Sequence, residues 1–188
     1  AHTCPASRSP PILALAASGS ELFSGAQSGA LVSWNGQTGT KAQTFQASGS
    51  PPILALAASG SKLFSGDQSG ALVSWDTTSG TTEQQTMQAS SGSPILALAV
   101  SGSKLFSGDG NGALVCWLTS GPKVRTMQEG AGEPINTLAA SGSKVYTGGD
   151  GTLTSWDSLG GLVTLDRDGI AFDNLTVALA HNAVRRAP

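Results

Sequence analysis

The sequence predicts an all-β fold of four consecutive four-stranded antiparallel sheets, and three observations support this. A unit of about 41 residues recurs four times, short apolar segments alternate with Ser/Gly turns within each unit, and each unit contains one tryptophan in its third segment. The tryptophans are spaced by 41, 42 and 39 residues and are Trp34, Trp75, Trp117 and Trp156. A fixed period of this length indicates that each repeat is one supersecondary unit.

The first three segments of a unit have the pattern of short strands, as the second unit shows. Residues 53–58 form an unbroken apolar run, which is typical of a strand buried on both faces. Residues 62–66 follow a turn at Ser59-Gly60, and residues 71–76 follow a turn at residues 68–70. Glycine supplies the positive φ angles that such turns require. These segments therefore predict three strands joined by tight turns.

The fourth segment, residues 81–88 in the second unit, is rich in Thr and Gln. It contains one bulky apolar residue in each unit, and these residues are Phe45, Met87, Met127 and Leu165. A single apolar position among polar neighbours predicts a strand with one buried face and one solvated face.

Polarity thus rises from the first segment to the fourth, which favours a β-propeller in which each four-stranded sheet stands radially as a blade. The four blades occupy residues 11–165, with repeats starting near residues 11, 52, 94 and 134, after an irregular segment at residues 1–10. A β-helix would expose its strands more evenly to solvent. A helical solenoid would not place Gly and Ser inside every candidate element.

The tail, residues 166–188, predicts the start of a fifth, degenerate repeat, because Leu179 follows Leu138 by 41 residues. Four such units form a partial or small ring, so we expect self-association or further blades to close it. The chain begins with Ala1 instead of Met, and we interpret it as a fragment of a longer protein.

The motif Ser-Gly-x-x-x-Gly-x-Leu-x-x-Trp-Asp, at residues 65–76, resembles the repeat of the WD-repeat family of β-propellers. The resemblance covers Pro11 to about Leu165, and the dipeptide is degenerate in two units. The four dipeptides are Trp34-Asn35, Trp75-Asp76, Trp117-Leu118 and Trp156-Asp157. The Gly-His pair of many family members is missing, although the second segments carry the hydroxyl that its histidine would bond. These hydroxyl residues are Ser24, Ser65, Ser107 and Thr147.

The composition argues against several functional classes. The net charge is −2 and 12% of the residues are charged, which disfavours nucleic acid and membrane surfaces as partners. His2 and His181 lie outside the repeats, and Cys116 replaces a serine of the other units, so we expect no catalytic site, metal or cofactor. We expect an intracellular, cytoplasmic protein that is not an enzyme.

Aspartates in the turns between the second and third segments have two interpretations. Asp67, Asp109 and Asp150 could bond the backbone of their own turns or ligate calcium, and the Gly-flanked context favours the turn. The tryptophans likewise could stack against sugars, but their position beside Leu and Val favours packing between blades.

The resemblance implies a non-catalytic scaffold that binds protein or peptide partners through loops at one end of the propeller. The turns between second and third segments and the connections between blades would form this surface. The candidate contact residues are Gln27, Ser50, Gln68, Ser93, Asn111, Glu133 and Asp150. A carbohydrate-binding propeller and a quinone-dependent enzyme are the alternatives.

Overall fold

The computed structural model describes residues 10–46, 49, 51–78, 85–88, 92–128, 132–157 and 162–165. These residues form sixteen β-strands in four antiparallel sheets of four strands each, and they contain no helix long and apolar enough to cross a membrane. The predicted all-β fold of four-stranded blades is therefore confirmed. Residues 1–9, the tail from residue 166 and its predicted fifth repeat lie outside the described residues.

Each sheet is formed by four strands that are consecutive in the chain, and we number the sheets blade 1 to blade 4. Blade 1 contains β1 (Ile12–Ser18), β2 (Glu21–Ala26), β3 (Ala30–Asn35) and β4 (Lys41–Gln46); blade 2 contains β5 (Ile53–Ser59), β6 (Lys62–Asp67), β7 (Ala71–Asp76) and β8 (Gln85–Gln88); blade 3 contains β9 (Ile95–Ser101), β10 (Lys104–Asp109), β11 (Ala113–Leu118) and β12 (Lys123–Gln128); blade 4 contains β13 (Thr137–Ser141), β14 (Lys144–Gly148), β15 (Leu153–Asp157) and β16 (Leu162–Leu165).

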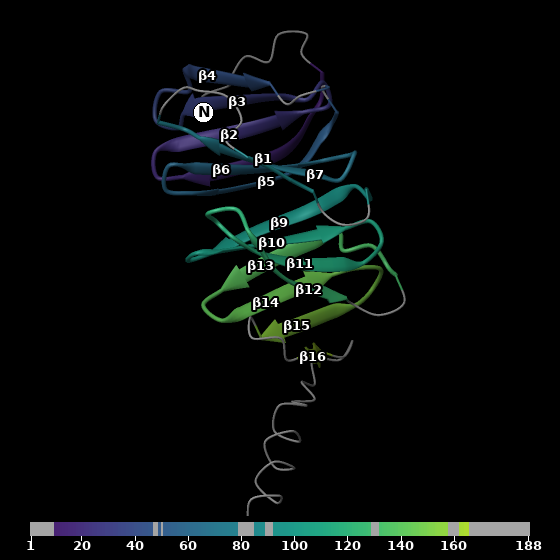
Figure 1. Cartoon of the computed structure of the whole chain (residues 1–188). Coiled ribbons are helices and arrows are strands. Elements are labelled where there is room, and N and C mark those ends of the chain that lie inside the picture. The colour runs from purple at the N-terminus through teal and green to yellow at the C-terminus, as the bar shows by residue number, and fades with distance from the viewer. Residues whose placement is uncertain are drawn as a thin grey trace, which may run out of the picture.

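The blades follow one another in chain order, from β1–β4 at the top of Figure 1 to β13–β16 at the bottom. The first strands of neighbouring blades contact each other, β1 with β5, β5 with β9 and β9 with β13. The apolar first segments therefore converge on the inner side of the structure, as the rise in polarity along each unit predicts.

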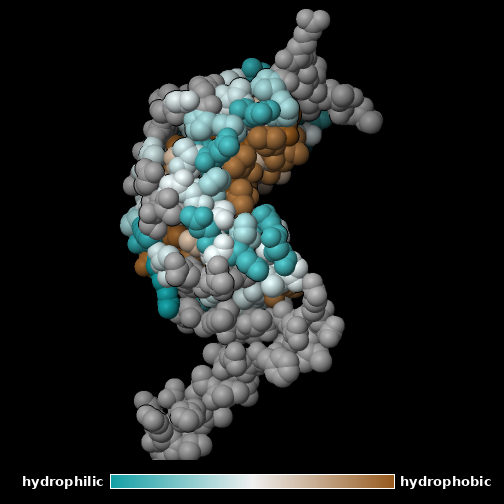
Figure 2. All heavy atoms as spheres, turned by 90° about the vertical axis from the view of Figure 1, so that its right-hand side faces the viewer, coloured by the Kyte–Doolittle hydropathy of each residue, from teal (hydrophilic) through white to brown (hydrophobic). Residues whose placement is uncertain are grey.

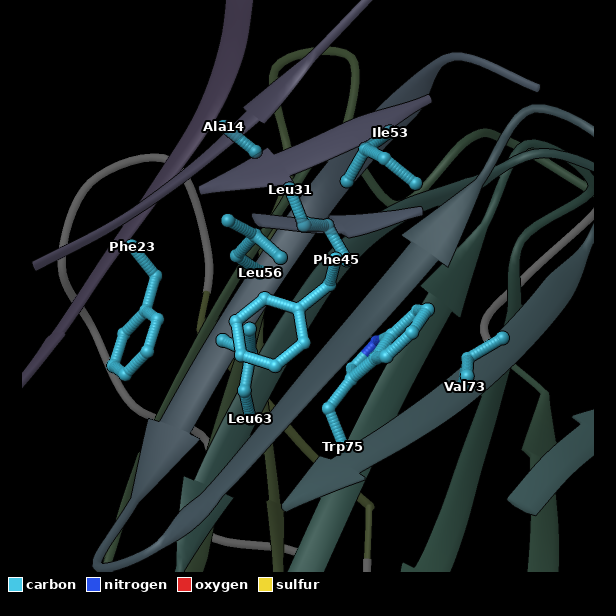
Figure 3. Packing of buried hydrophobic residues seen from close by; sticks show 9 residues of the cluster. All are labelled: Ala14, Phe23, Leu31, Phe45, Ile53, Leu56, Leu63, Val73 and Trp75. Carbon is cyan, nitrogen blue, oxygen red and sulfur yellow. The ribbon is translucent and has the colours of Figure 1, made fainter. Parts of the chain in front are cut away.

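Hydrophobic cores form between consecutive blades. Side chains of β2, β3 and β4 in blade 1 pack against side chains of β5, β6 and β7 in blade 2 (Figure 3). A β-bulge between Ile53 and Ala55 shifts the pairing of β5 with β6. Because of this shift Ile53 and Leu56 both face blade 1, whereas Ala55 and Ala57 face blade 3. One strand thus contributes to two interfaces.

Candidate functional site

The antiparallel order of the strands places two kinds of connection at the same end of the molecule. The turns between second and third strands lie beside the segments that enter each first strand. Backbone bonds join them: the Gln27 amide donates to the Pro11 carbonyl at 2.9 Å, and the Gln68 amide donates to the Pro52 carbonyl at 3.0 Å. The two kinds of connection that were predicted to form the contact surface therefore lie at the same end of the blades.

Charged residues divide between the two ends of the blades. All five lysines of the chain start a second or a fourth strand, at the end opposite the predicted contact surface; they are Lys41, Lys62, Lys104, Lys123 and Lys144. That end, which we call the lysine end, also holds Glu21, Asp76 and Asp157. The charged residues described at the contact end are all acidic, and they are Asp67, Asp109, Glu133 and Asp150. We call this the acidic end.

The residues predicted for partner binding differ in their accessibility. Five of them are exposed at the acidic end: Gln27, Gln68, Asn111, Glu133 and Asp150. Ser93 is only 6% exposed and lies beneath this surface, because the connection that contains it packs against the turn at Gly70. Its expected surface position is therefore wrong. Ser50 lies outside the described residues.

Three of the exposed residues are brought together where blades 3 and 4 meet. Gly112, the neighbour of Asn111, lies against the carbonyl of Glu133. Gly149, the neighbour of Asp150, lies against the carbonyl of Pro134. Asn136 adds an amide that donates to Oδ1 of Asp150 at 3.3 Å. These contacts bring four exposed polar residues together, and we call them the acidic cluster: Asn111, Glu133, Asn136 and Asp150.

Two buried aspartates organise the neighbouring turns. Oδ1 of Asp67 accepts bonds from the amide and hydroxyl of Ser69 at 2.8 and 2.7 Å and from the Ala71 amide at 3.0 Å. Oδ1 of Asp109 accepts from the amides of Asn111 and Ala113 at 2.9 and 2.8 Å. Both aspartates therefore bond the backbone of their own turns, which is the interpretation that the sequence favoured over calcium ligation. The described residues include no group of three or more His, Cys, Asp or Glu side chains that could hold a metal ion.

Asp67→Ala should lower the free energy of unfolding by about 2 kcal/mol, because amides in a tight turn lose a charged acceptor. The corresponding position in blade 1 is Ala26, so the backbone of this turn tolerates an alanine side chain. Urea unfolding measures the change. Gln68→Ala, in the same turn but exposed, is the control and should change stability by less than about 0.5 kcal/mol. Equal losses in the two variants would show that the carboxylate does not organise the turn.

The tryptophans lie away from the acidic end and have a structural role. Each indole Nε1 donates to the hydroxyl of the second strand in the same blade, at 2.8 to 3.1 Å. Trp75, Trp117 and Trp156 are buried between blades, as predicted, whereas Trp34 is half-buried. The indole was not predicted as the donor, because the resemblance to the WD-repeat family pairs these hydroxyls with a histidine.

Cys116 is buried in the interface between blades 3 and 4. Burial raises the pKa of its thiol, and the positive charge of Lys104 lowers that pKa to a smaller extent. The thiol form is therefore favoured, which agrees with a small core residue and not with an activated nucleophile.

Comparison with known proteins identifies the fold. No family model matches the chain, and no curated protein matches its sequence. Among solved structures, the computationally designed Ika4 protein is 25% identical, with a TM-score of 0.71 over 81% of this chain and 94% of that one. The RRP9 WD40 repeats are 22% identical, with a TM-score of 0.75 over 85% of this chain and 52% of that one.

Two further structures agree with this. U3-55K is 23% identical, with a TM-score of 0.73 over 83% of this chain and 52% of that one. The computationally designed Ika8 protein is 26% identical, with a TM-score of 0.68 over 78% of this chain and 45% of that one. The chain has the fold of a WD-repeat β-propeller, and it spans about half the length of RRP9, U3-55K and Ika8.

Proposed function

We propose that the protein is a non-catalytic scaffold that binds a protein or peptide partner at its acidic end. The observation that carries this proposal is the acidic cluster, which presents polar side chains on turns held by backbone contacts. Little conformational entropy is lost when a partner binds to side chains that already sit on a rigid frame. The fold shared with WD40-repeat structures supports the same class of function.

The charge distribution suggests the chemistry of the partner. Glu133 and Asp150 are exposed, and the described residues of this end include no lysine or arginine to neutralise them. A peptide that carries Lys or Arg would therefore complement the cluster, and complementary charge gives specificity and a faster association. We propose a basic peptide segment as the partner of this end.

A displayed library of random peptides, selected on the full chain, tests the proposal. Selected peptides should be enriched in Lys and Arg, and Glu133→Gln combined with Asp150→Asn should weaken their binding at least about tenfold at low salt. Lys41→Gln combined with Lys123→Gln, at the lysine end, is the matched control and should leave binding unchanged. Peptides without basic residues, or binding that survives loss of both acids, would overturn the proposal.

The carbohydrate alternative depends on exposed aromatic platforms, and the structure buries three of the four tryptophans. Trp34 is the one that retains partial exposure, and it lies at the open side of blade 1 and not at the acidic end. A glycan array provides the decisive measurement, because saturable binding to a defined sugar would favour a lectin over a scaffold.

A further inference from the structure

One interface occurs three times within the chain. We call the side of a blade that packs on the following blade its front face, and the side that packs on the preceding blade its rear face. Between blades 1 and 2, Phe23 and Leu31 of the front face meet Ile53, Leu63 and Trp75 of the rear face (Figure 3). The corresponding residues of blades 2 and 3, and of blades 3 and 4, form the second and third copies.

A glycine and an isoleucine mark the centre of every copy. The front face has a glycine in its second strand, and the isoleucine at the start of the next blade's rear face occupies the space above it. A Cβ at Gly25 would lie 2.6 Å from Cγ2 of Ile53. The same distance is 2.4 Å both for Gly66 with Ile95 and for Gly108 with Ile135. Each isoleucine fits only because the facing residue has no side chain.

The rear face of blade 1 exposes the residues that this interface buries elsewhere. Ile12 is 46% exposed and Leu15 is 62% exposed, whereas their counterparts in blade 2, Ile53 and Leu56, are 0% and 8% exposed. Figure 2 shows hydrophobic residues gathered at the hollow side of the upper blades. Exposed apolar patches of this kind mark sites of association.

The front face of blade 4 is open in the complementary way. Leu153 is 50% exposed, whereas Leu31, Leu72 and Leu114 at the same position in the other blades are fully buried. Gly148 corresponds to Gly25, yet a Cβ placed there would meet only Thr137 of its own blade. Among the described residues, no isoleucine of a following blade covers this glycine.

We propose that a second copy of this chain closes the ring, with the front face of blade 4 in each copy packed on the rear face of blade 1 in the other. The two open faces are the two halves of the interface that the chain already forms three times. Ile12 of one copy then covers Gly148 of the other. Such a head-to-tail contact forms a closed ring when the rotation between copies closes.

The second copy would also complete a polar contact that the blade interfaces within the chain already make. The Ser18 hydroxyl donates to the Gly60 carbonyl at 3.3 Å, and the Ser101 hydroxyl donates to the Gly142 carbonyl at 3.1 Å, each across a blade interface. In the proposed ring, Ser141 of one copy reaches the Gly19 carbonyl of the other. Two copies would together match the length of the single-chain folds that resemble this one, since this chain covers 52% of the U3-55K chain and 45% of the Ika8 chain.

The two faces that close the ring do not include the proposed peptide site. Native mass spectrometry and sedimentation velocity of the full chain at micromolar concentration should give twice the chain mass. A folded monomer would overturn the proposal and would mean that these faces stay open or are covered by the chain itself. A trimer or a filament would equally overturn closure by two copies.

Substitutions on the two faces test the pairing. Leu15→Glu and Leu153→Glu each place a charge in both interfaces of the dimer, so each should raise the dissociation constant at least about a hundredfold. Val124→Glu is the matched control, because Val124 is 55% exposed on β12, away from both faces, and the dimer should persist. Circular dichroism verifies that all three variants keep their sheets.

Mixing the two variants distinguishes head-to-tail pairing from a symmetric contact. Leu15→Glu keeps its front face and Leu153→Glu keeps its rear face, so an equal mixture should regain part of the dimer through one intact interface. A dimer that Leu153→Glu leaves unchanged would be a rear-to-rear contact and would overturn the proposal. Acrylamide should quench more tryptophan fluorescence in Leu15→Glu than in the unmodified chain, because Trp34 becomes accessible to solvent.

Discussion

Gly108→Val should lower the free energy of unfolding by about 3 kcal/mol, one of the two largest effects we expect. A Cβ at this position would lie 2.4 Å from Cγ2 and 2.8 Å from Cβ of Ile135, so blades 3 and 4 must separate to admit the valine. Ile135 is fully buried, so its side chain cannot move out into solvent to make room. The midpoint of urea unfolding, followed by circular dichroism, measures the loss.

A substitution of Ile135, the residue that faces Gly108, provides the control. Ile135→Ala alone should cost about 3 kcal/mol, because it leaves a cavity in the interface. In the double variant the valine fills part of that cavity, so the combined loss should be smaller than the sum by at least about 1 kcal/mol. Strictly additive losses would contradict the idea that the two residues share one space.

Trp75→Ala should cost about 4 kcal/mol, because it removes the largest fully buried side chain of the core. The Trp75 ring packs against Phe45 of blade 1, with 5.8 Å between ring centroids and 59° between ring planes. Its Nε1 donates to the Ser65 hydroxyl at 2.8 Å, and that hydroxyl loses its donor in the variant. Thermal and urea unfolding both report the change.

Trp34→Ala is the matched comparison, because Trp34 forms the same bond, to Ser24 at 2.9 Å, and the described residues provide no blade that packs on it from the preceding side. Both substitutions are best made in the Leu15→Glu variant, which we expect to be monomeric. There Trp34→Ala should cost less than half as much as Trp75→Ala. Equal losses would show that the indole bond, and not packing between blades, determines the stability contributed by these residues.

Much of the architecture follows directly from the repeat. Short apolar segments separated by glycine turns predicted β5, β6 and β7 to within a residue of their observed bounds. The Asp67 and Asp109 turns could also be predicted, since a short acceptor beside glycine bonds its own backbone wherever the turn lies. These features depend on neighbours in sequence, and the sequence alone therefore determines them.

The candidate site was predicted only in part. The turns at Gln68 and Asn111 were placed correctly on the surface, but Ser93 was not, because its burial depends on packing against a turn more than twenty residues earlier. The segregation of lysines from exposed acids was missed as well. Lysines that look scattered along the chain gather at one end because the strands alternate in direction.

Blades 1 and 2 have nearly the same sequence but differ in how deeply their side chains are buried. Residues 11–34 and 52–75 differ at two positions, and local sequence is therefore enough to give both blades the same strands, turns and indole bond. Yet Leu15 is 62% exposed while its counterpart Leu56 is 8% exposed. Local sequence sets backbone conformation, whereas burial requires another surface on the opposite side, and blade 2 has a preceding blade to provide it.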